Sequence, residues 1–230
     1  MSEPKIILWD LETSNLSANF GKIISFGWKE LGSKKVTVAS LLNFKSSFKK
    51  GIISDKELVS YAHSILSQAD AWVTYYGRKF DVPFLNTRLI RHDLNVLPDV
   101  KHIDVWFTSK FKLKLNSNRL KSVTEFLGVH EKTPVVGEIW NNAVTGHRPS
   151  IKYINEHCYH DVIALEDVYY KLRPLLLQHP NSNFFTGIEG SCPICSSPNI
   201  EKRGRQLVAK KIHQRLHCKN CGKWFNGEVL

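Results

Sequence analysis

Long apolar runs are missing from this 230-residue sequence, as are internal repeats and low-complexity segments. No stretch approaches the roughly 20 apolar residues that a helix needs to cross a bilayer. The N-terminus, with Glu3 and Pro4 ahead of the first apolar stretch, lacks the pattern of a secretory signal peptide. We therefore expect an intracellular protein without a membrane partner, located in the cytoplasm or nucleoid, or in the cytoplasm of an infected cell if it is viral.

Acidic residues are scarce, because 21 Asp and Glu stand against 32 Lys and Arg, and the formal net charge is +11. Such an excess suggests a polyanionic partner such as nucleic acid. The excess is uneven, since residues 190–230 carry eight basic residues and two acidic ones. Cysteines are also few, and four of the five lie in this tail. Without a secretion signal, a metal site in a reducing compartment explains that clustering better than disulfides do.

The apolar patterns predict a mixed α/β domain followed by a small second one, which the chain length allows. Runs rich in β-branched residues predict strands at 6–13, 23–28, 36–42, 71–76 and 102–107, with a turn at 32–35. Apolar periodicity predicts helices at 54–66, 82–91, 120–127 and 150–177. Ser54 and Glu57 have the spacing of a capping box. We divide the chain into a domain at 1–178, a linker at 179–190 and a terminal domain at 191–230.

Two carboxylates end the first predicted strand. Asp10 and Glu12 stand two residues apart, so in a strand their side chains point to the same face. Two anions held side by side in a buried element repel each other unless a cation joins them. A strand that runs out into a solvated acidic turn is the alternative, and for an isolated Asp-x-Glu it would be preferred. The acidic residues further along the chain favour the cation site.

Two of these later residues are Asp81 and Asp161. Asp81 stands after Gly77, where a helix is predicted to begin, and an isolated Asp there would only cap the helix. Asp161 lies beside the apolar stripe of the last long helix, and His157 precedes it by four residues, on the same face. Carboxylate oxygens suit Mg²⁺ or Mn²⁺. The four carboxylates thus predict two such ions roughly 3.5–4 Å apart that cleave phosphodiesters, with His157 positioning or deprotonating a water.

These motifs resemble those of the DEDD 3′–5′ exonucleases of the ribonuclease H-like fold, which include the proofreading domains of family B DNA polymerases. Asp10 and Glu12 match the first motif, the stretch 76–88 (YGRKFDVPFLNTR) matches the second, and Asp161 matches the third. The segment 120–129 resembles the one between motifs two and three, so the similarity covers about residues 5–175. The resemblance implies a ribonuclease H-like mixed five-stranded sheet flanked by helices.

The resemblance also implies an activity. This activity is the metal-dependent removal of nucleoside monophosphates from the 3′ ends of single strands, of DNA rather than RNA. The resemblance implies that Asp10, Glu12, Asp81 and Asp161 bind two Mg²⁺ or Mn²⁺ ions. In the family's pocket, Leu11 and Phe80 would support the terminal nucleotide. The alternatives are an exoribonuclease of the same fold, an endonuclease of the same fold, and a nucleic-acid-binding module without activity.

Two positions depart from the family pattern. Tyr76 stands where the family often has Asn, and His157 stands where one branch has the Tyr of Tyr-x-x-x-Asp. The branch that uses histidine places it five residues before the Asp rather than four. The site therefore combines the spacing of one branch with the side chain of the other.

A basic segment after the fifth predicted strand is a candidate path for nucleic acid. Its cations are interleaved with apolar residues, and such cations contact phosphates in nucleic-acid grooves. They are Lys110, Lys112, Lys114, Arg119 and Lys121. A solvated helix face is an equally good interpretation.

The tail contains two Cys-x-x-Cys motifs, which suit one structural Zn²⁺ bound by four thiolates. They are formed by Cys192 and Cys195 and by Cys218 and Cys221. Disulfides or an iron site of the rubredoxin type are weaker alternatives. The stretch 205–218 predicts the hairpin of a zinc ribbon. A domain this small builds little core, so the metal would supply most of its folding free energy.

The same tail is rich in cations and carries an aromatic residue after the last cysteine. A basic surface with an aromatic platform is typical of proteins that grip nucleic acid. The residues expected to do so are Arg203, Arg205, Lys210, Lys211, Arg215 and Trp224. A ribbon that docks another protein, or that merely covers the first domain, is the alternative.

Overall fold

The computed structural model describes residues 4–51, 53–129, 137–176, 179–183 and 187–230. A mixed five-stranded sheet forms its first part, with the strand order β3-β2-β1-β4-β5. The strands are β1 (Ile6–Thr13), β2 (Ile23–Glu30), β3 (Thr37–Ser40), β4 (Ala71–Thr74) and β5 (Lys101–Asp104). The pairs β1–β2 and β2–β3 are antiparallel, while β1–β4 and β4–β5 are parallel. This arrangement confirms the mixed five-stranded sheet that the sequence predicts.

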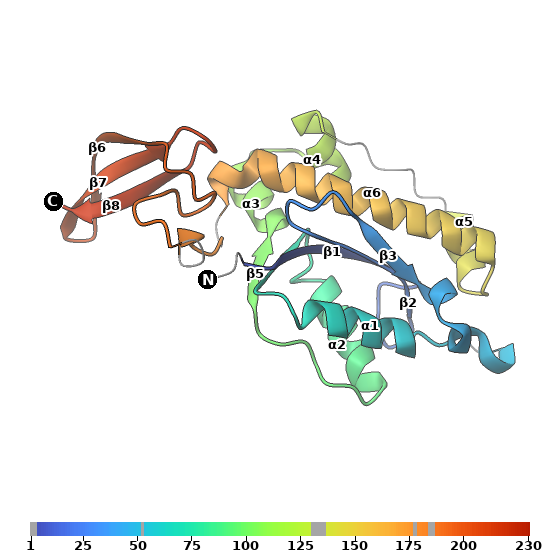
Figure 1. The fold of residues 1–230 in the computed structure, drawn as a ribbon. Helices are drawn as coiled ribbons and strands as arrows, with labels where there is room; N and C mark the ends of the chain where they lie inside the picture. The colour runs from blue at the N-terminus through green and yellow to red at the C-terminus, as the bar shows by residue number, and fades with distance from the viewer. Residues whose placement is uncertain (1–3, 52, 130–136, 177–178, 184–186) are drawn as a thin grey trace.

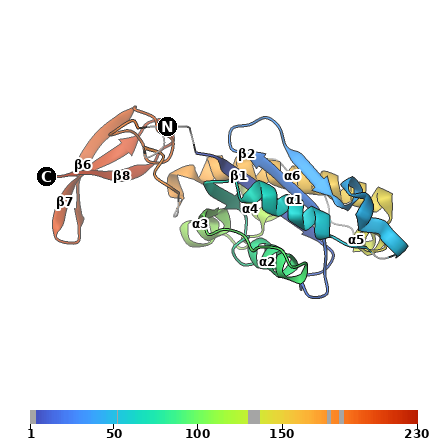
Figure 2. The same cartoon turned by 60° about the horizontal axis from the view of Figure 1, so that its bottom comes forward.

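Helices cover both faces of this sheet (Figure 1). The helices α1 (Lys56–Leu66) and α2 (Asp81–Arg91) lie on one face, and α6 (Arg148–Leu172) lies on the other, as the turned view in Figure 2 also shows. The shorter helices are α3 (Val105–Lys112), α4 (Leu120–Leu127) and α5 (Gly137–Ala143), with 3₁₀ turns at Leu41–Asn43, Lys45–Gly51 and Arg173–Leu175. None of the helices in the described part of the chain is long and apolar enough to cross a membrane.

The alternation of β1 divides the core into two layers. Ile7, Trp9 and Leu11 pack with the residues of α1 and α2, while Ile6 and Leu8 pack with those of α6. All five side chains are buried, and each large apolar side chain buried in this way stabilises the fold by roughly 1.5–3 kcal/mol. Beyond Leu8, the face towards α6 carries acidic residues instead of apolar ones.

Two predicted strands are shorter in the structure because polar residues begin a helical turn inside them. The strand predicted at 36–42 ends at Ser40, whose hydroxyl accepts a hydrogen bond from the Leu42 amide at 3.3 Å. The strand predicted at 102–107 ends at Asp104, whose carboxylate accepts one from the Trp106 amide at 3.1 Å. In both places the apolar residues that follow belong to a helix and not to the sheet, and the prediction was wrong there.

The predicted capping box of α1 does not form. The residue at the N-cap is Asp55, and it makes no side-chain cap hydrogen bond. Asp55 instead points into the core, where it forms an ion pair with Arg88 at 2.7 Å and accepts a hydrogen bond from the Ile23 amide at 2.9 Å. His92 lies 2.7 Å from the same carboxylate. This buried cluster joins the start of β2 to α1 and α2.

Replacing Asp55 with Asn is expected to destabilise the fold by about 3–5 kcal/mol, because it leaves the buried guanidinium of Arg88 without its counter-charge. Urea unfolding at pH 7 measures this difference. Asp99→Asn is the matched control, since Asp99 is exposed and its loss should change the free energy of unfolding by less than about 0.5 kcal/mol. Equal stability of the two variants would contradict a stabilising role for the cluster.

The contribution of Asp55 should also depend on pH. Burial alone would raise the pKa of this carboxyl, but hydrogen bonds from Arg88, His92 and the Ile23 amide outweigh burial and hold the pKa below the ordinary value of an aspartic acid. The stabilisation is therefore fully present above that value and is lost as the pH falls through the lower pKa of the folded state. The gap between wild type and Asp55→Asn should shrink at strongly acidic pH.

The C-terminal part is a three-stranded antiparallel sheet in the order β6-β7-β8. Its strands are β6 (Ile200–Val208), β7 (Lys211–Cys218) and β8 (Trp224–Val229). The hairpin predicted within 205–218 is present, whereas the sequence analysis did not identify β8. The segments next to these strands contact the 3₁₀ turn that follows α6, since Arg173 donates to the Ile194 carbonyl at 3.0 Å and Lys223 donates to the Leu176 carbonyl at 3.2 Å.

Candidate functional site

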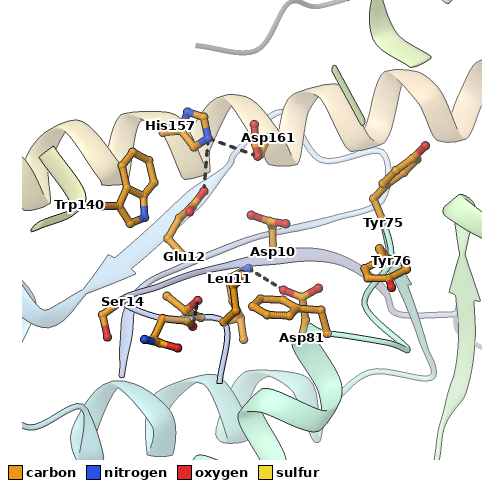
Figure 3. Close-up of a pocket in the computed structure, with 14 residues that line it drawn as sticks. Asp10, Leu11, Glu12, Ser14, Tyr75, Tyr76, Asp81, Trp140, His157 and Asp161 are labelled. Carbon is orange, nitrogen blue, oxygen red and sulfur yellow. Dashed lines mark hydrogen bonds and ion pairs between the residues drawn. The ribbon is translucent and has the colours of Figure 1, made fainter. Parts of the chain in front are cut away.

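The acidic residues of β1 lie beneath α6, which approaches the sheet closely because Gly27 has no side chain. Gly27 pairs with Asp10 across β1 and β2, and a Cβ at Gly27 would lie 2.7 Å from the Cys158 sulfur. A larger residue there would push α6 away from the sheet. The Cys158 thiol donates to the carbonyl oxygen of Asp10 over 3.8 Å. The close contact brings His157 and Asp161 over the carboxylates of β1 (Figure 3).

Asp81 reaches the same place from the other face of the sheet. It is the first residue of α2 and not its cap, since the N-cap is Phe80. Its Oδ1 accepts a hydrogen bond from the Leu11 amide at 3.3 Å, as Figure 3 shows. The side chain is almost completely buried. Asp81 therefore ties the start of α2 to the strand that carries the other two carboxylates.

The turn before α2 is held by Asp104, which the sequence analysis did not identify. Its two carboxylate oxygens accept hydrogen bonds from the amides of Tyr76, at 2.8 Å, and Arg78, at 3.0 Å. Tyr76 has a φ of +69°, a conformation that residues with a side chain rarely adopt. A Cβ at Gly77 would lie 2.3 Å from the hydroxyl oxygen of Thr74, so only glycine fits. Asp104 and this tight turn fix where α2 begins.

The buried carboxylates affect one another electrostatically. The pKa of Asp81 is raised to about 7, chiefly because the group is buried and further because Asp104 and Asp161 carry negative charge nearby. The amide hydrogen bond from Leu11 acts in the opposite direction. An ionised carboxylate here is costly without a counter-charge, and a divalent cation would supply one. The all-oxygen donor set of Asp10, Glu12, Asp81 and Asp161 fits Mg²⁺ or Mn²⁺.

His157 faces two of these carboxylates. Its Nε2 lies 3.7 Å from Glu12 Oε1 and 3.7 Å from Asp161 Oδ2. One donor atom from each of these three residues lies within 4.8 Å of the others, a spacing that a single metal ion can bridge. The Trp140 ring and the imidazole pack in a T-shaped arrangement, with ring centroids 5.4 Å apart and an interplanar angle of 90°.

The four carboxylates and His157 line one cavity of about 440 Å³. The residues predicted from sequence that line it are Asp10, Leu11, Glu12, Phe80, Asp81, His157 and Asp161. The sequence analysis missed Trp140 and Ser14, which also line the cavity. Trp140 belongs to α5, a seven-residue helix too short to give a periodic signal in the sequence.

A second cavity, of about 520 Å³, shares Tyr75 and Tyr76 with the first. Lys110 and Arg119, two of the five cations predicted to follow nucleic acid, line it together with Trp106. The ring of Trp106 lies edge-on to Tyr76 at 5.0 Å. The other three cations do not line this cavity; they are Lys112, Lys114 and Lys121.

The four cysteines of the tail come together as the spacing predicts. The sulfurs of Cys192 and Cys221 are 3.5 Å apart, and those of Cys195 and Cys218 are 3.6 Å apart. A disulfide needs about 2.05 Å, so these thiols are free, and the disulfide alternative is wrong. Four thiolates bound to one Zn²⁺ at about 2.3 Å lie roughly 3.8 Å from one another, close to what is observed. The cluster therefore fits a tetrahedral zinc site.

The predicted cations of the tail are all exposed, and all but Lys210, which lies in the turn between β6 and β7, belong to strands of its sheet. The guanidinium of Arg215 lies over the ring of Trp224, 5.0 Å from its centre, and the ring of His217 lies 4.5 Å from the same indole. Arg215 also donates to the Arg203 carbonyl at 2.9 Å. Trp224 is 48% exposed. A cation held over a half-exposed indole forms a flat, positively charged surface.

The comparison with known families identifies the class of protein. The RNase H superfamily matches residues 7–173, and the chain belongs to this superfamily. Its fold is similar to that of the family B DNA polymerase from the hyperthermophilic archaeon Pyrobaculum calidifontis, with a TM-score of 0.58 and 12% sequence identity. The similarity covers 92% of this chain and 32% of the polymerase chain. No curated protein matches the sequence. The ribonuclease H-like fold expected from the motifs is confirmed.

Proposed function

We propose that this protein is a metal-dependent 3′–5′ exonuclease that hydrolyses single-stranded DNA. The observation that carries the proposal is the convergence of four carboxylates, from β1, α2 and α6, on one cavity. Membership of the RNase H superfamily supports nuclease activity, and the motif resemblance supports the exonuclease branch.

The four carboxylates would hold the metal ions. Asp10, Glu12, Asp81 and Asp161 are the proposed ligands of two Mg²⁺ or Mn²⁺ ions. Such a pair of ions activates a water and stabilises the leaving oxygen during phosphodiester cleavage. The raised pKa of Asp81 supports this assignment, because a buried carboxylate that is costly to ionise gains from a bound cation.

The residues around the carboxylates would position the DNA. Leu11 and Phe80 line the first cavity, where an apolar contact would support the terminal nucleotide. Lys110 and Arg119 line the adjoining cavity, where they would contact the phosphates of preceding nucleotides. The aromatic rings shared by the two cavities suit base stacking, which is tolerant of sequence.

The tail would bind one structural Zn²⁺ through its four cysteines and would help to grip the nucleic acid. Its exposed cations and the Arg215–Trp224 pair support that role. The preference for DNA over RNA is proposed from the motif resemblance to the proofreading domains of family B DNA polymerases. An intracellular location is also proposed, because the four free thiols of the tail suit a reducing compartment.

Digestion of 5′-labelled single-stranded DNA with added Mg²⁺ or Mn²⁺ tests the proposal. We expect a ladder of products that shorten from the 3′ end and no cleavage of a circular single strand of the same sequence. Cleavage of the circle would indicate an endonuclease. Preferential digestion of matched RNA would indicate an exoribonuclease. Binding without cleavage by either metal would contradict the enzymatic function.

A further inference from the structure

His157 lies next to two carboxylates of the proposed metal site. Its side chain is 4% exposed and projects from α6 into the cavity, towards Glu12 and Asp161 (Figure 3). The two carboxylate oxygens come from different elements, β1 and α6, and the imidazole nitrogen is equally distant from both. The nitrogen therefore faces the place where these two carboxylates would share a cation.

The distances fit shared coordination better than direct hydrogen bonds. Both contacts of Nε2 measure 3.7 Å, longer than the roughly 2.7–3.2 Å of an N–H···O hydrogen bond. Ligand atoms bound to one cation at about 2.0–2.2 Å lie roughly 3–3.6 Å from their neighbours. The three donor atoms lie within 4.8 Å of one another, so small side-chain adjustments bring them around a common ion.

The surroundings hold the imidazole in this orientation. The Trp140 ring packs edge-on against it, and α5, which carries Trp140, packs on α6 through Ile139 and Ile151. A ring packed in this way needs little further ordering when it binds a metal. The next histidine of α6, His160, lies outside the cavity lining and packs against Tyr159 instead.

We infer that His157 is a direct nitrogen ligand of one of the two divalent cations, together with Glu12 and Asp161, and that it biases this site towards Mn²⁺ over Mg²⁺. The inference rests on the proposed function, because it concerns the cations of that same site. Mg²⁺ strongly prefers oxygen ligands, whereas Mn²⁺ and later first-row ions accept imidazole. A carboxylate-only site has no such bias, so a histidine at the position where one branch has tyrosine changes which ion the protein selects.

Electron spin-echo envelope modulation of Mn²⁺ bound to the full chain tests the inference without measuring activity. We expect ¹⁴N modulation from a directly bound imidazole in wild type and in the matched control His160→Tyr. The modulation should be absent from His157→Gln and from His157→Tyr. The Gln variant is included because the larger Tyr ring meets Trp140 and can disturb folding.

Metal affinities provide the second measurement. His157→Gln should weaken Mn²⁺ binding about tenfold or more and leave Mg²⁺ binding, measured by competition with Mn²⁺, nearly unchanged. Three results would each overturn the inference. They are modulation that persists in both His157 variants, modulation missing from wild type with Mn²⁺ bound, and an equal loss of affinity for both ions in His157→Gln. A wild-type protein that shows the modulation but does not digest DNA would contradict the proposed function and leave the metal ligand established.

Discussion

Replacing Asp10 with Asn should lower the rate of phosphodiester hydrolysis about 10³-fold or more while the fold stays intact. Figure 3 shows Asp10 between Asp161 on one side and Asp81 on the other, so it is placed to contact both proposed cations. Metal-based charge stabilisation is worth several kcal/mol in the transition state, and each 1.4 kcal/mol corresponds to about a tenfold change in rate. Single-turnover digestion of 5′-labelled single-stranded DNA at saturating Mn²⁺ measures the loss.

The stability of the same variant separates a catalytic role from a structural one. Removing one of several neighbouring negative charges relieves repulsion, so the melting temperature of Asp10→Asn without added metal should equal or exceed that of wild type. Glu156→Gln is the matched control, since Glu156 is an exposed carboxylate of α6 one residue before His157. This control should digest DNA at the wild-type rate. An active Asp10→Asn variant would remove Asp10 from the proposed metal site.

Removing the tail metal should unfold the three-stranded sheet of β6, β7 and β8 and leave the five-stranded sheet folded. The described apolar core of the tail is small, consisting of Cys192, Ile194 and Cys218 with four partly buried neighbours. Structural zinc supplies roughly 10–16 kcal/mol of binding free energy to such domains, so their folding is coupled to the metal. Elemental analysis should find one zinc per chain, and amide hydrogen exchange after chelation should show loss of protection confined to residues 191–229.

Cys218→Ser should reproduce the effect of chelation, because it removes one of the four ligands. Cys158→Ala is the matched control, since Cys158 lies in α6 away from this cluster and its loss should leave the zinc content unchanged. If the sheet keeps its hydrogen-exchange protection without metal, the cluster is not what holds the tail together. Weaker DNA binding by Cys218→Ser, with digestion of short substrates retained, would support the proposed role of the tail in gripping nucleic acid.

One thiol of the tail, that of Cys195, is already prepared for a metal, whereas burial raises the pKa of the Cys192 and Cys221 thiols. Burial tends to raise the pKa of Cys195, but hydrogen bonds from the Ser197 amide, the Asn220 side chain and the neighbouring thiols outweigh burial and lower it to about 7. The Asn220 amide lies 3.7 Å from this sulfur, and the Ile194 amide lies 3.5 Å from the sulfur of Cys192. Such hydrogen bonds favour the thiolate form, which is the form that binds zinc.

Local sequence determined the positions of the acidic residues and of the four clustered cysteines. The period of a strand places Asp10 and Glu12 on one face, and the period of a helix places His157 and Asp161 on another. Both patterns depend only on near neighbours along the chain, and the structure has all four residues lining one cavity. The Cys-x-x-Cys spacing is local in the same way, and its two pairs meet as expected.

Strand ends were predicted less well, because they depend on single polar side chains. Ser40 and Asp104 each begin a helical turn where an apolar run alone predicts that the strand continues. The capping box predicted for Ser54 and Glu57 does not form, because Asp55 is the N-cap residue and its carboxylate binds Arg88 and His92 in the core. These partners lie more than 30 residues away in sequence, so local propensity gives no sign of them.

The sequence is enough to infer the superfamily, the strand that carries the first two carboxylates, the helices that carry Asp81 and Asp161, and the four cysteines. How these groups meet depends instead on contacts that form in the folded protein. The missing side chain of Gly27 sets how close α6 comes to β1, Asp104 fixes the turn that places Asp81, and Trp140 orients His157. These are contacts between elements distant in the chain, and their geometry follows from packing and burial, which sequence periodicity does not encode.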